Sequence, residues 1–175
     1  MNLIISFSAR TTGNCGEVAK YIFTPGDKLV HFKDLNVHCC NNCEYECFND
    51  ACKFRDDDMY ALYDSMQKYD KVILIVPMYC GNPSSLYFTF TERSQDYFFH
   101  NDETYKIIEE KLYIIGIYGS RKESPCFLAH FEQWFDSQSP THHVLGIERH
   151  EFNQRMADSV LDLAVVRNEI KSFVK

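Results

Sequence analysis

The segment LIISFSARTTGNCG, residues 3–16, decides the fold class of this sequence. It opens with an apolar run at residues 3–7 that does not alternate with polar residues, a pattern typical of a strand buried on both faces of a parallel sheet. The run ends in a loop rich in hydroxyls and glycine, and a helical pattern follows at residues 14–23. The segment therefore predicts a strand, a loop and a helix in succession, which is the repeating unit of an α/β fold.

The same alternation continues along the chain. Apolar runs predict further strands at residues 72–76 and 112–117, and weaker patterns add strands at residues 28–32 and 142–147. Helical spacing predicts the intervening helices at residues 56–69, 84–99 and 124–135, and in a tail from residue 156 to residue 174. This order indicates a three-layer α/β sandwich, with a five-stranded parallel sheet between helices on both faces. No repeat or linker interrupts it, so residues 1–175 are expected to form one domain with a Cys-rich insertion at about residues 36–56.

Composition and charge restrict the function classes. The chain has 175 residues, of which 45% are apolar and 25% charged, and its formal net charge is −7. Because there is no basic tail or Lys/Arg block, this charge argues against binding mainly through nucleic-acid phosphates or an anionic membrane surface. The apolar runs are too short to span a bilayer, and the first residues lack the pattern of a secretory signal. We therefore expect a cytoplasmic protein with no nucleic-acid or membrane partner.

The loop after the first strand, SARTTGNCG at residues 8–16, predicts an anion site. It combines hydroxyl side chains, one arginine and glycines that permit tight backbone geometry, and it opens onto a helix. Successive N–H groups at a helix N-terminus bind phosphate without much net charge, although an ordinary capped turn has a similar composition. The sequence has neither G-x-x-x-x-G-K-[ST] nor G-x-G-x-x-G, which argues against a nucleotide triphosphatase and against a dinucleotide-binding fingerprint.

Two further loops follow strands at the same edge of the predicted sheet, where an open α/β sheet binds its ligand. The loop PMYCGNPS, residues 77–84, has two prolines and a glycine that fix the backbone, a flat side chain in Tyr79 and an amide in Asn82. It suits a planar polar ring, although a rigid turn without a ligand has the same composition. The loop at residues 118–122 is expected to close over the same ligand.

The loops SxRxxGNC, residues 8–15, and PMYCGN, residues 77–82, carry a family resemblance. They resemble loops of the NAD(P)H-dependent FMN reductase branch of the flavodoxin-like superfamily, which includes the iron–sulfur flavoproteins. The resemblance implies a flavodoxin-like fold with strand order 2-1-3-4-5 and FMN as the cofactor. It assigns the FMN phosphate to Ser8, Arg10, Thr12, Gly13, Asn14 and Cys15, with Cys15 standing where relatives usually have Ser or Thr. It assigns the isoalloxazine ring to Pro77, Met78, Tyr79, Cys80, Gly81 and Asn82, and the other edge of the ring to Tyr118, Gly119 and Ser120.

Five of the eight cysteines fall within residues 39–52. Four of them, followed by Asp57-Asp58-Met59, resemble the cysteine segment of the iron–sulfur flavoproteins. This resemblance implies a [4Fe–4S] cluster on Cys40, Cys43, Cys47 and Cys52. Their spacing is C-x₂-C-x₃-C-x₄-C, one residue longer between the second and third members than the compact C-x₂-C-x₂-C pattern. The alternatives are zinc held by four thiolates or by His38 with three, free thiols, and a reversible disulfide.

These features together predict an FMN-dependent oxidoreductase that accepts hydride from NAD(P)H and reduces a quinone, flavin, metal or protein acceptor. No catalytic side chain is expected, because the cofactor carries the chemistry while the protein supplies binding and orientation. The resemblance also implies a homodimer or homotetramer. The alternatives are an iron–sulfur flavoprotein that transfers electrons between partner proteins and a metal-stabilised binding module without redox turnover.

Overall fold

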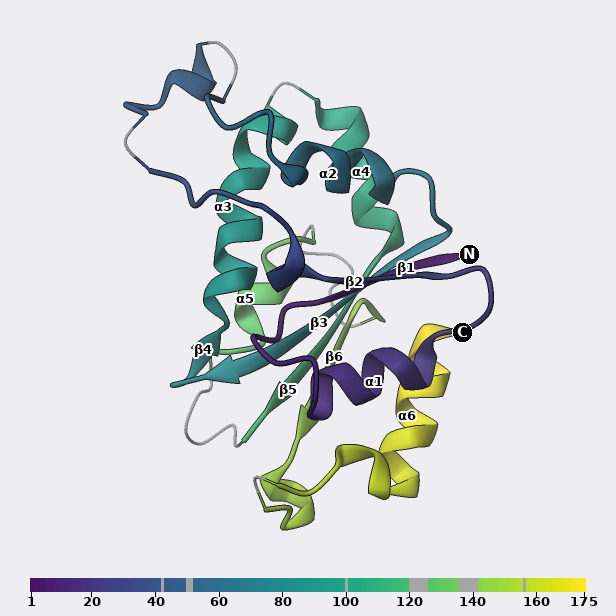
Figure 1. Ribbon diagram of the computed structural model, residues 1–175. Coiled ribbons are helices and arrows are strands. Elements are labelled where there is room, and N and C mark those ends of the chain that lie inside the picture. Colours follow the sequence, from purple (N-terminus) through teal and green to yellow (C-terminus); the bar gives the residue numbers. More distant parts are fainter. Residues whose placement is uncertain (42, 50–51, 100, 120–125, 136–141, 156) are drawn as a thin grey trace.

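The structure is a computed structural model that describes residues 1–41, 43–49, 52–99, 101–119, 126–135, 142–155 and 157–175. Its centre is a sheet in which five strands run parallel in the order β2-β1-β3-β5-β6 (Figure 1). These strands are β1 (Asn2–Ser6), β2 (Lys28–His31), β3 (Lys71–Tyr79), β5 (Leu112–Tyr118) and β6 (Val144–Glu148). Counted along the chain, this is the predicted 2-1-3-4-5 order, so the flavodoxin-like α/β fold is confirmed.

The sheet has six strands rather than the five expected. The additional strand, β4 (Asn82–Pro83), pairs antiparallel with the end of β3, with Met78 opposite Pro83. Cys80 and Gly81 form the turn between the two strands, with φ angles of +48° and +82°. Because two successive residues with positive φ reverse a chain tightly, β4 is the return of a short hairpin that the apolar pattern of β3 does not reveal.

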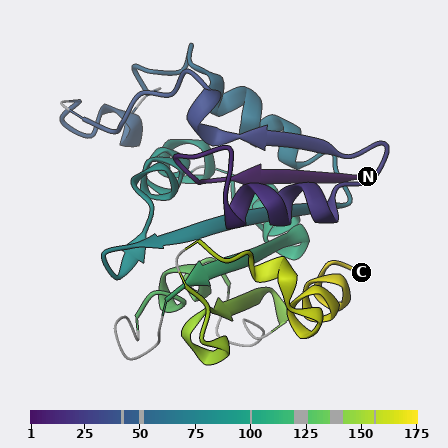
Figure 2. The same cartoon turned by 60° about the horizontal axis from the view of Figure 1, so that its bottom comes forward.

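Helices cover both faces of the sheet (Figure 1 and Figure 2). One face carries α1 (Asn14–Ile22) and α6 (Ala164–Val174), and the other carries α2 (Asp58–Met66), α3 (Ser85–Phe99), α4 (Asp102–Lys111) and α5 (Ala129–Glu132). The short 3₁₀ helices are η1 (Phe32–Asp34), η2 (Glu46–Phe48), η4 (His150–Phe152) and η5 (Val160–Asp162). Within the described ranges, no helix is long and apolar enough to cross a membrane.

Both faces of the central strands are buried, which explains why their sequences do not alternate. In β1, Leu3 and Ile5 belong to the core that contains Tyr63 and Phe90 from α2 and α3, whereas Ile4 belongs to the core formed with α1 and α6. All five of these side chains are fully buried. Burying one side chain of this kind contributes about 1.5–3 kcal/mol, so the two cores hold the strand ends in a fixed register.

Three helical segments differ from the sequence-based expectation. The pattern does not predict α4, because this helix is mostly polar and only Thr104 and Ile108 of its residues are buried. The tail helix begins at Ala164 rather than near residue 156, and Val160 lies instead in η5. In the segment expected to be helical at residues 124–135, the described part contains only the short α5.

Candidate functional site

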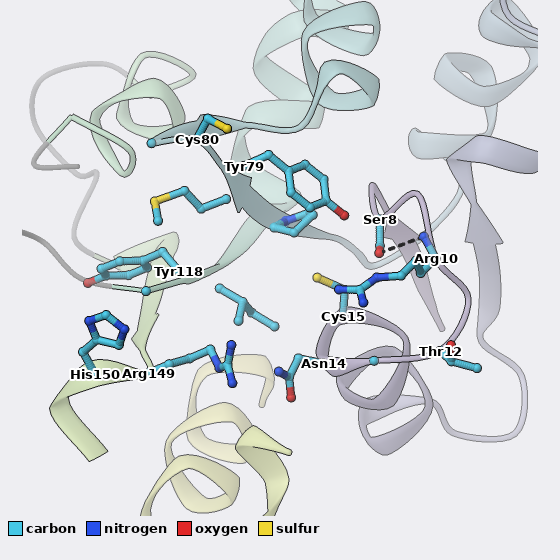
Figure 3. A pocket seen from close by; sticks show the side chains of 16 residues that line it. Ser8, Arg10, Thr12, Asn14, Cys15, Tyr79, Cys80, Tyr118, Arg149 and His150 are labelled. Carbon is cyan, nitrogen blue, oxygen red and sulfur yellow. Dashed lines mark hydrogen bonds between the residues drawn. The ribbon is translucent and has the colours of Figure 1, made fainter. Parts of the chain in front are cut away.

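A cavity of about 540 Å³ opens at the carboxyl edge of the sheet, where β1, β3, β5 and β6 end (Figure 3). This volume falls within the range of small-molecule and cofactor sites. We call the cavity the edge pocket. Its described lining residues are Ser8, Arg10, Thr12, Gly13, Asn14, Cys15, Pro77, Met78, Tyr79, Cys80, Gly81, Ile117, Tyr118, Gly119, Arg149 and His150. The structure thus brings the three loops singled out in the sequence to one cavity.

The β1 loop presents the start of α1 to the edge pocket. Gly13 has a φ of +105°, which an L side chain rarely adopts, and a Cβ atom on Gly16 would lie 2.2 Å from the carbonyl oxygen of Thr11. Glycine at both positions therefore lets the loop fold tightly against the first turn of α1. Within the loop, the backbone N–H of Arg10 donates to Ser8 Oγ over 3.1 Å. Because the first N–H groups of a helix have no partner within the helix, this loop offers them to an anion.

Two side chains of the β1 loop contribute little as donors. Asn14 Oδ1 accepts from the backbone N–H of Val160 at 2.8 Å, and Asn14 Nδ2 donates to the Asp158 carbonyl at 3.4 Å, so this amide ties α1 to the C-terminal segment. Burial raises the pKa of the Cys15 thiol to about 12, although Arg10 acts in the opposite direction. A neutral thiol is a weak hydrogen-bond donor. The donors that the loop has left for an anion are therefore its backbone N–H groups, Arg10 and the hydroxyls of Ser8 and Thr12.

The β3 loop forms a flat and partly apolar wall of the edge pocket. Every residue at positions 77–81 lines it, and the ring of Tyr79 remains 39% exposed. Asn82, which the sequence groups with them, is not among the described lining residues, because its Nδ2 donates to the Cys80 carbonyl at 3.1 Å across the hairpin turn. The wall combines aromatic and thioether surface with main-chain polar groups, an arrangement that suits a planar ring.

The ends of β5 and β6 complete the site. Tyr118 and Gly119 line the edge pocket as expected, whereas Ser120 lies outside the described residues. Arg149 and His150 also line it, and sequence reasoning missed both. Their backbone N–H groups donate to the carbonyls of Tyr118 and Gly119, each at 3.0 Å. The available signal was their position in the sequence. Both residues lie within three positions of the strand predicted at residues 142–147, and the carboxyl ends of parallel strands meet at one edge.

The charge of the edge pocket differs from that of the whole chain. The net charge of the protein is −7, yet the described residues that line the pocket include two arginines and neither Asp nor Glu. Arginine and helix N-terminal N–H groups bind phosphate, and the tyrosines, Met78 and Ile117 offer surface for a ring system. The residues present therefore fit FMN, whose phosphate would find its donors at the β1 loop and whose ring would find apolar surface at the β3 and β5 loops.

The cysteine segment, residues 36–56, lies apart from the edge pocket, next to α3 (Figure 1). Its thiols gather at a cavity of about 20 Å³, lined by Cys40, Cys43, Cys47 and Cys52 together with Glu92 and Asp96 of α3. Burial and the neighbouring thiols and carboxylates raise the pKa of Cys40 and of Cys47 above the ordinary thiol value. Among the described residues, no group of three or more His, Cys, Asp or Glu side chains is arranged to hold a metal ion. The described residues therefore give no support for an iron–sulfur cluster or a zinc ion, and we derive no step through either.

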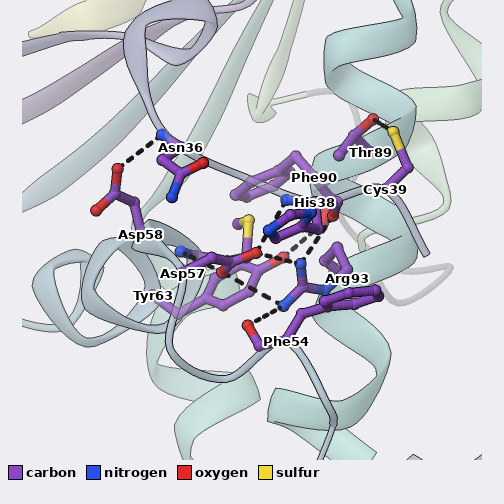
Figure 4. Close-up of polar contacts among 11 residues, drawn as sticks. Asn36, His38, Cys39, Phe54, Asp57, Asp58, Tyr63, Thr89, Phe90 and Arg93 are labelled. Atoms are coloured by element: carbon purple, nitrogen blue, oxygen red, sulfur yellow. Dashed lines mark hydrogen bonds and ion pairs between the residues drawn. The ribbon is translucent and has the colours of Figure 1, made fainter. Parts of the chain in front are cut away.

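A buried ion pair closes the cysteine segment at its base (Figure 4). Arg93 Nη1 donates to the His38 carbonyl at 2.8 Å and to Asp57 Oδ2 at 2.5 Å, and its Nη2 donates to the Phe54 carbonyl at 3.0 Å. The side chains of Arg93 and Asp57 are each 2% exposed. Burial alone would raise the pKa of Asp57, but hydrogen bonds from Arg93 and from the His38 and Met59 backbones hold this pKa below its ordinary value. The pair thus joins both ends of the segment to α3.

Known proteins give a family and a set of structural neighbours. The sequence profile of a family described as NADPH-dependent FMN reductase matches residues 2–147 of the 175-residue chain. No curated protein sequence matches the chain. Many solved structures share its fold, and three of them illustrate the range of the likeness.

The three neighbours are similar in fold at low sequence identity. The Trp repressor binding protein from Bacillus subtilis has a TM-score of 0.68 at 13% identity, with 100% of this chain and 98% of that chain covered. RosB, solved with bound 8-demethyl-8-formylriboflavin-5'-phosphate, has a TM-score of 0.65 at 13% identity, with 99% of this chain and 75% of that chain covered. An FMN-dependent NADH-azoreductase from Bacillus anthracis, solved in complex with FMN, has a TM-score of 0.63 at 9% identity, with 99% of each chain covered.

Proposed function

Because the chain belongs to the NADPH-dependent FMN reductase family and is an FMN-dependent oxidoreductase, we propose that it reduces a small planar acceptor, a quinone or a free flavin, with electrons from NAD(P)H. The observation that carries this proposal is the edge pocket itself. It joins an anion-binding loop at the start of α1 to a flat wall at the ends of β3 and β5, within one cavity of about 540 Å³. A phosphorylated ring cofactor needs both parts in one place.

The residues of the chain bind and orient rather than transfer protons. The β1 loop would hold the phosphate through its N–H groups and Arg10, and the backbone of residues 77–81 would meet the polar edge of the ring. Bound FMN would supply the hydride chemistry, taking two electrons from the nicotinamide and passing them to the acceptor. The buried side chains of Ile117 and Tyr118 would keep water from the ring on the β5 side. Tyr79, 39% exposed, offers a surface on which a nicotinamide or a planar acceptor can stack in turn.

We also propose that the protein is a homodimer or homotetramer in the cytoplasm, with α3 at the subunit contact. The support is that Phe99 of α3 is 48% exposed and Phe88 is half-buried, while Tyr87 and Phe90 on the same helix are committed to the core. Exposed aromatic side chains of this kind are enriched in subunit interfaces.

The experiment is a spectroscopic titration of the purified protein with FMN, followed by anaerobic addition of NADH or NADPH. We expect FMN to bind and its visible absorbance to bleach, and to return when a quinone or a free flavin is added. A protein that does not take up FMN, or whose bound FMN is reduced by a ferredoxin but by neither nicotinamide, would contradict the proposal.

A pair of charge-reversal variants localises the phosphate. Arg10→Glu places a carboxylate in the β1 loop and should weaken FMN binding by roughly 100-fold or more, because a charge-assisted donor becomes a repulsive group. Lys20→Glu makes the same charge change at an exposed position of α1 that does not line the edge pocket, and it should leave FMN affinity within about twofold. Equal affinities in the two variants would mean that the phosphate binds elsewhere.

A further inference from the structure

β6 is followed directly by a buried arginine that the family resemblance does not account for. Arg149 is 8% exposed, yet it lines the edge pocket. Figure 3 shows its guanidinium group directed toward Asn14 at the start of α1, while Arg10 extends into the cavity from the opposite side. The two arginines of the pocket therefore flank the start of α1, one from the β1 loop and one from the end of β6.

The β1 loop offers a phosphate the hydroxyls of Ser8 and Thr12, but two of its other lining side chains contribute little. The Asn14 amide is engaged with the backbone of Asp158 and Val160, and Cys15 presents a buried thiol where a hydroxyl would donate strongly. A phosphate monoester carries a charge of about −1.5 to −2 at pH 7 and three acceptor oxygens. Arg10 supplies one positive charge, and the N–H groups at the start of α1 carry only partial charges. A second cation at this site would therefore balance the phosphate charge more fully.

The backbone and side chain of Arg149 are held in place. Its N–H donates to the Tyr118 carbonyl at 3.0 Å, and its own carbonyl accepts from Phe152 and Gln154, each at 3.2 Å. Its Nη2 donates to the carbonyl of Arg155. The Asp158 carboxylate also faces this region, where Arg155 chiefly, and Arg149 in addition, lower its pKa. A guanidinium carries five donors in a rigid fork, so it can hold a protein carbonyl and a phosphate oxygen together.

We infer that Arg149 is a second phosphate-binding residue of the edge pocket, which donates to the FMN phosphate from the side opposite Arg10 and makes the site prefer FMN over riboflavin. This inference rests on the proposed function, because it takes FMN as the occupant of the pocket. Arg149 supplies the charge and the donors that Asn14 and Cys15 do not. The C-terminal part of the chain thereby takes part in cofactor selection, although the two loops that carry the family resemblance lie before residue 83.

The test compares FMN with riboflavin, which has the same ring but no phosphate. Dissociation constants for both are measured by quenching of flavin fluorescence, with the wild type, Arg149→Gln, Arg149→Lys and the control Arg55→Gln. Arg149→Gln should weaken FMN binding by roughly 10- to 100-fold and change riboflavin binding by less than about twofold. The FMN affinity of Arg149→Lys should lie between those of the wild type and Arg149→Gln, because lysine keeps the charge but lacks the planar set of guanidinium donors. Arg55 is an exposed arginine outside the edge pocket, and its loss should change neither constant.

The outcomes separate this inference from the proposed function. A wild type that binds no FMN overturns the proposed function. A wild type that binds FMN, together with an Arg149→Gln variant that loses FMN and riboflavin affinity equally or loses neither, overturns only the inference. If circular dichroism shows that Arg149→Gln is unfolded, the wild type is treated with phenylglyoxal and the modified arginines are mapped by mass spectrometry. Protection of Arg149 by inorganic phosphate and by FMN supports the inference, and absence of protection by phosphate overturns it.

Discussion

The edge pocket and the cysteine segment each place cysteines near an arginine, but the two regions use their arginines differently. In the cysteine segment, Arg93 is 2% exposed and its donors are spent on the His38 and Phe54 carbonyls and on Asp57. In the edge pocket, Arg10 is exposed and faces a cavity of about 540 Å³, against about 20 Å³ at the four clustered thiols. The one region is closed by its polar contacts, and the other is kept open for a ligand.

This difference shows that the type of a residue does not by itself assign its role. Four closely spaced cysteines suggested a metal centre among other readings, and in the described structure they line a small cavity beside two carboxylates. A single arginine after a weakly predicted strand suggested nothing, yet it lines the edge pocket. The deciding property is whether the polar atoms of a side chain are committed to the protein or directed into space that a ligand can fill.

The largest expected effect comes from breaking the Arg93–Asp57 pair. Arg93→Gln leaves a buried carboxylate without its cation and should lower the free energy of unfolding by about 3–5 kcal/mol. Arg55→Gln, which removes an arginine 53% exposed at its side chain and 3.8 Å from Asp96, should cost at most about 1 kcal/mol. Urea unfolding measures both variants. Because the pair lies outside the edge pocket, FMN affinity of the folded Arg93→Gln variant should be unchanged, and its loss would contradict the separation of the two regions.

Acid should weaken the same pair. The folded-state pKa of Asp57 lies below its unfolded value, so its stabilisation is fully present above about pH 4 and is lost as the pH falls through the folded pKa. Other carboxylates with lowered pKa values, among them Asp27 and Asp158, also contribute to acid unfolding. We therefore compare the wild type with Asp57→Asn, whose site does not titrate. The difference in unfolding free energy between the wild type and Asp57→Asn should narrow below about pH 4. A constant difference down to pH 2 would mean that Asp57 does not contribute to the loss of stability in acid.

The sequence predicted the sheet well because the same physical cause produces the pattern and the fold. Residues 3–7, apart from Ser6, and residues 72–76 are apolar because helices cover both faces of their strands. Every apolar side chain of these two runs is buried in one of the two cores. The helix α4 left no such pattern, because a helix that buries only Thr104 and Ile108 is mostly polar. Its start depends on the Asn101 cap, a local signal that is weak without periodicity behind it.

The site was predictable as far as consecutive residues build it. The β1 and β3 loops are continuous in sequence and follow strong strands, so their meeting at one edge could be expected. Arg149 follows one of the two weakly predicted strands, and the Asn14 amide is bonded to Asp158 and Val160, more than 140 residues away. Such contacts between distant segments decide which donors remain for a ligand, and no spacing rule in one sequence contains them. The same holds for Glu92 and Asp96, which α3 brings to the clustered thiols.

A matched pair of glycines gives a smaller effect that separates backbone strain from ligand binding. Gly13 and Gly26 have φ angles of +105° and +102°, and an added Cβ would meet nothing within 4 Å at Gly13 and only the Met1 side chain at Gly26. Gly13→Ala and Gly26→Ala should each lose about 1–3 kcal/mol of stability. Only Gly13→Ala should weaken FMN binding, by roughly tenfold, because only Gly13 lines the edge pocket. Titration with FMN measures the affinity of both variants. An equal loss of affinity in Gly13→Ala and Gly26→Ala would mean that lost stability alone causes it.

The smallest effect is expected where the sequence pattern is most conspicuous. Replacing Cys40, Cys43, Cys47 and Cys52 together with serine keeps the size of each side chain and removes every thiol that lines the small cavity. Because the edge pocket shares no described lining residue with that cavity, FMN affinity and the rate of flavin bleaching by NAD(P)H should stay within about twofold of the wild type.

Anaerobic purification with iron and zinc analysis accompanies the measurement. Metal in the wild type but not in the variant, together with slower reduction of the acceptor, would mean that the thiols rearrange around a metal that joins the two regions into one electron path. If the wild type and the variant turn over equally and neither contains metal, the four thiols have a structural role only.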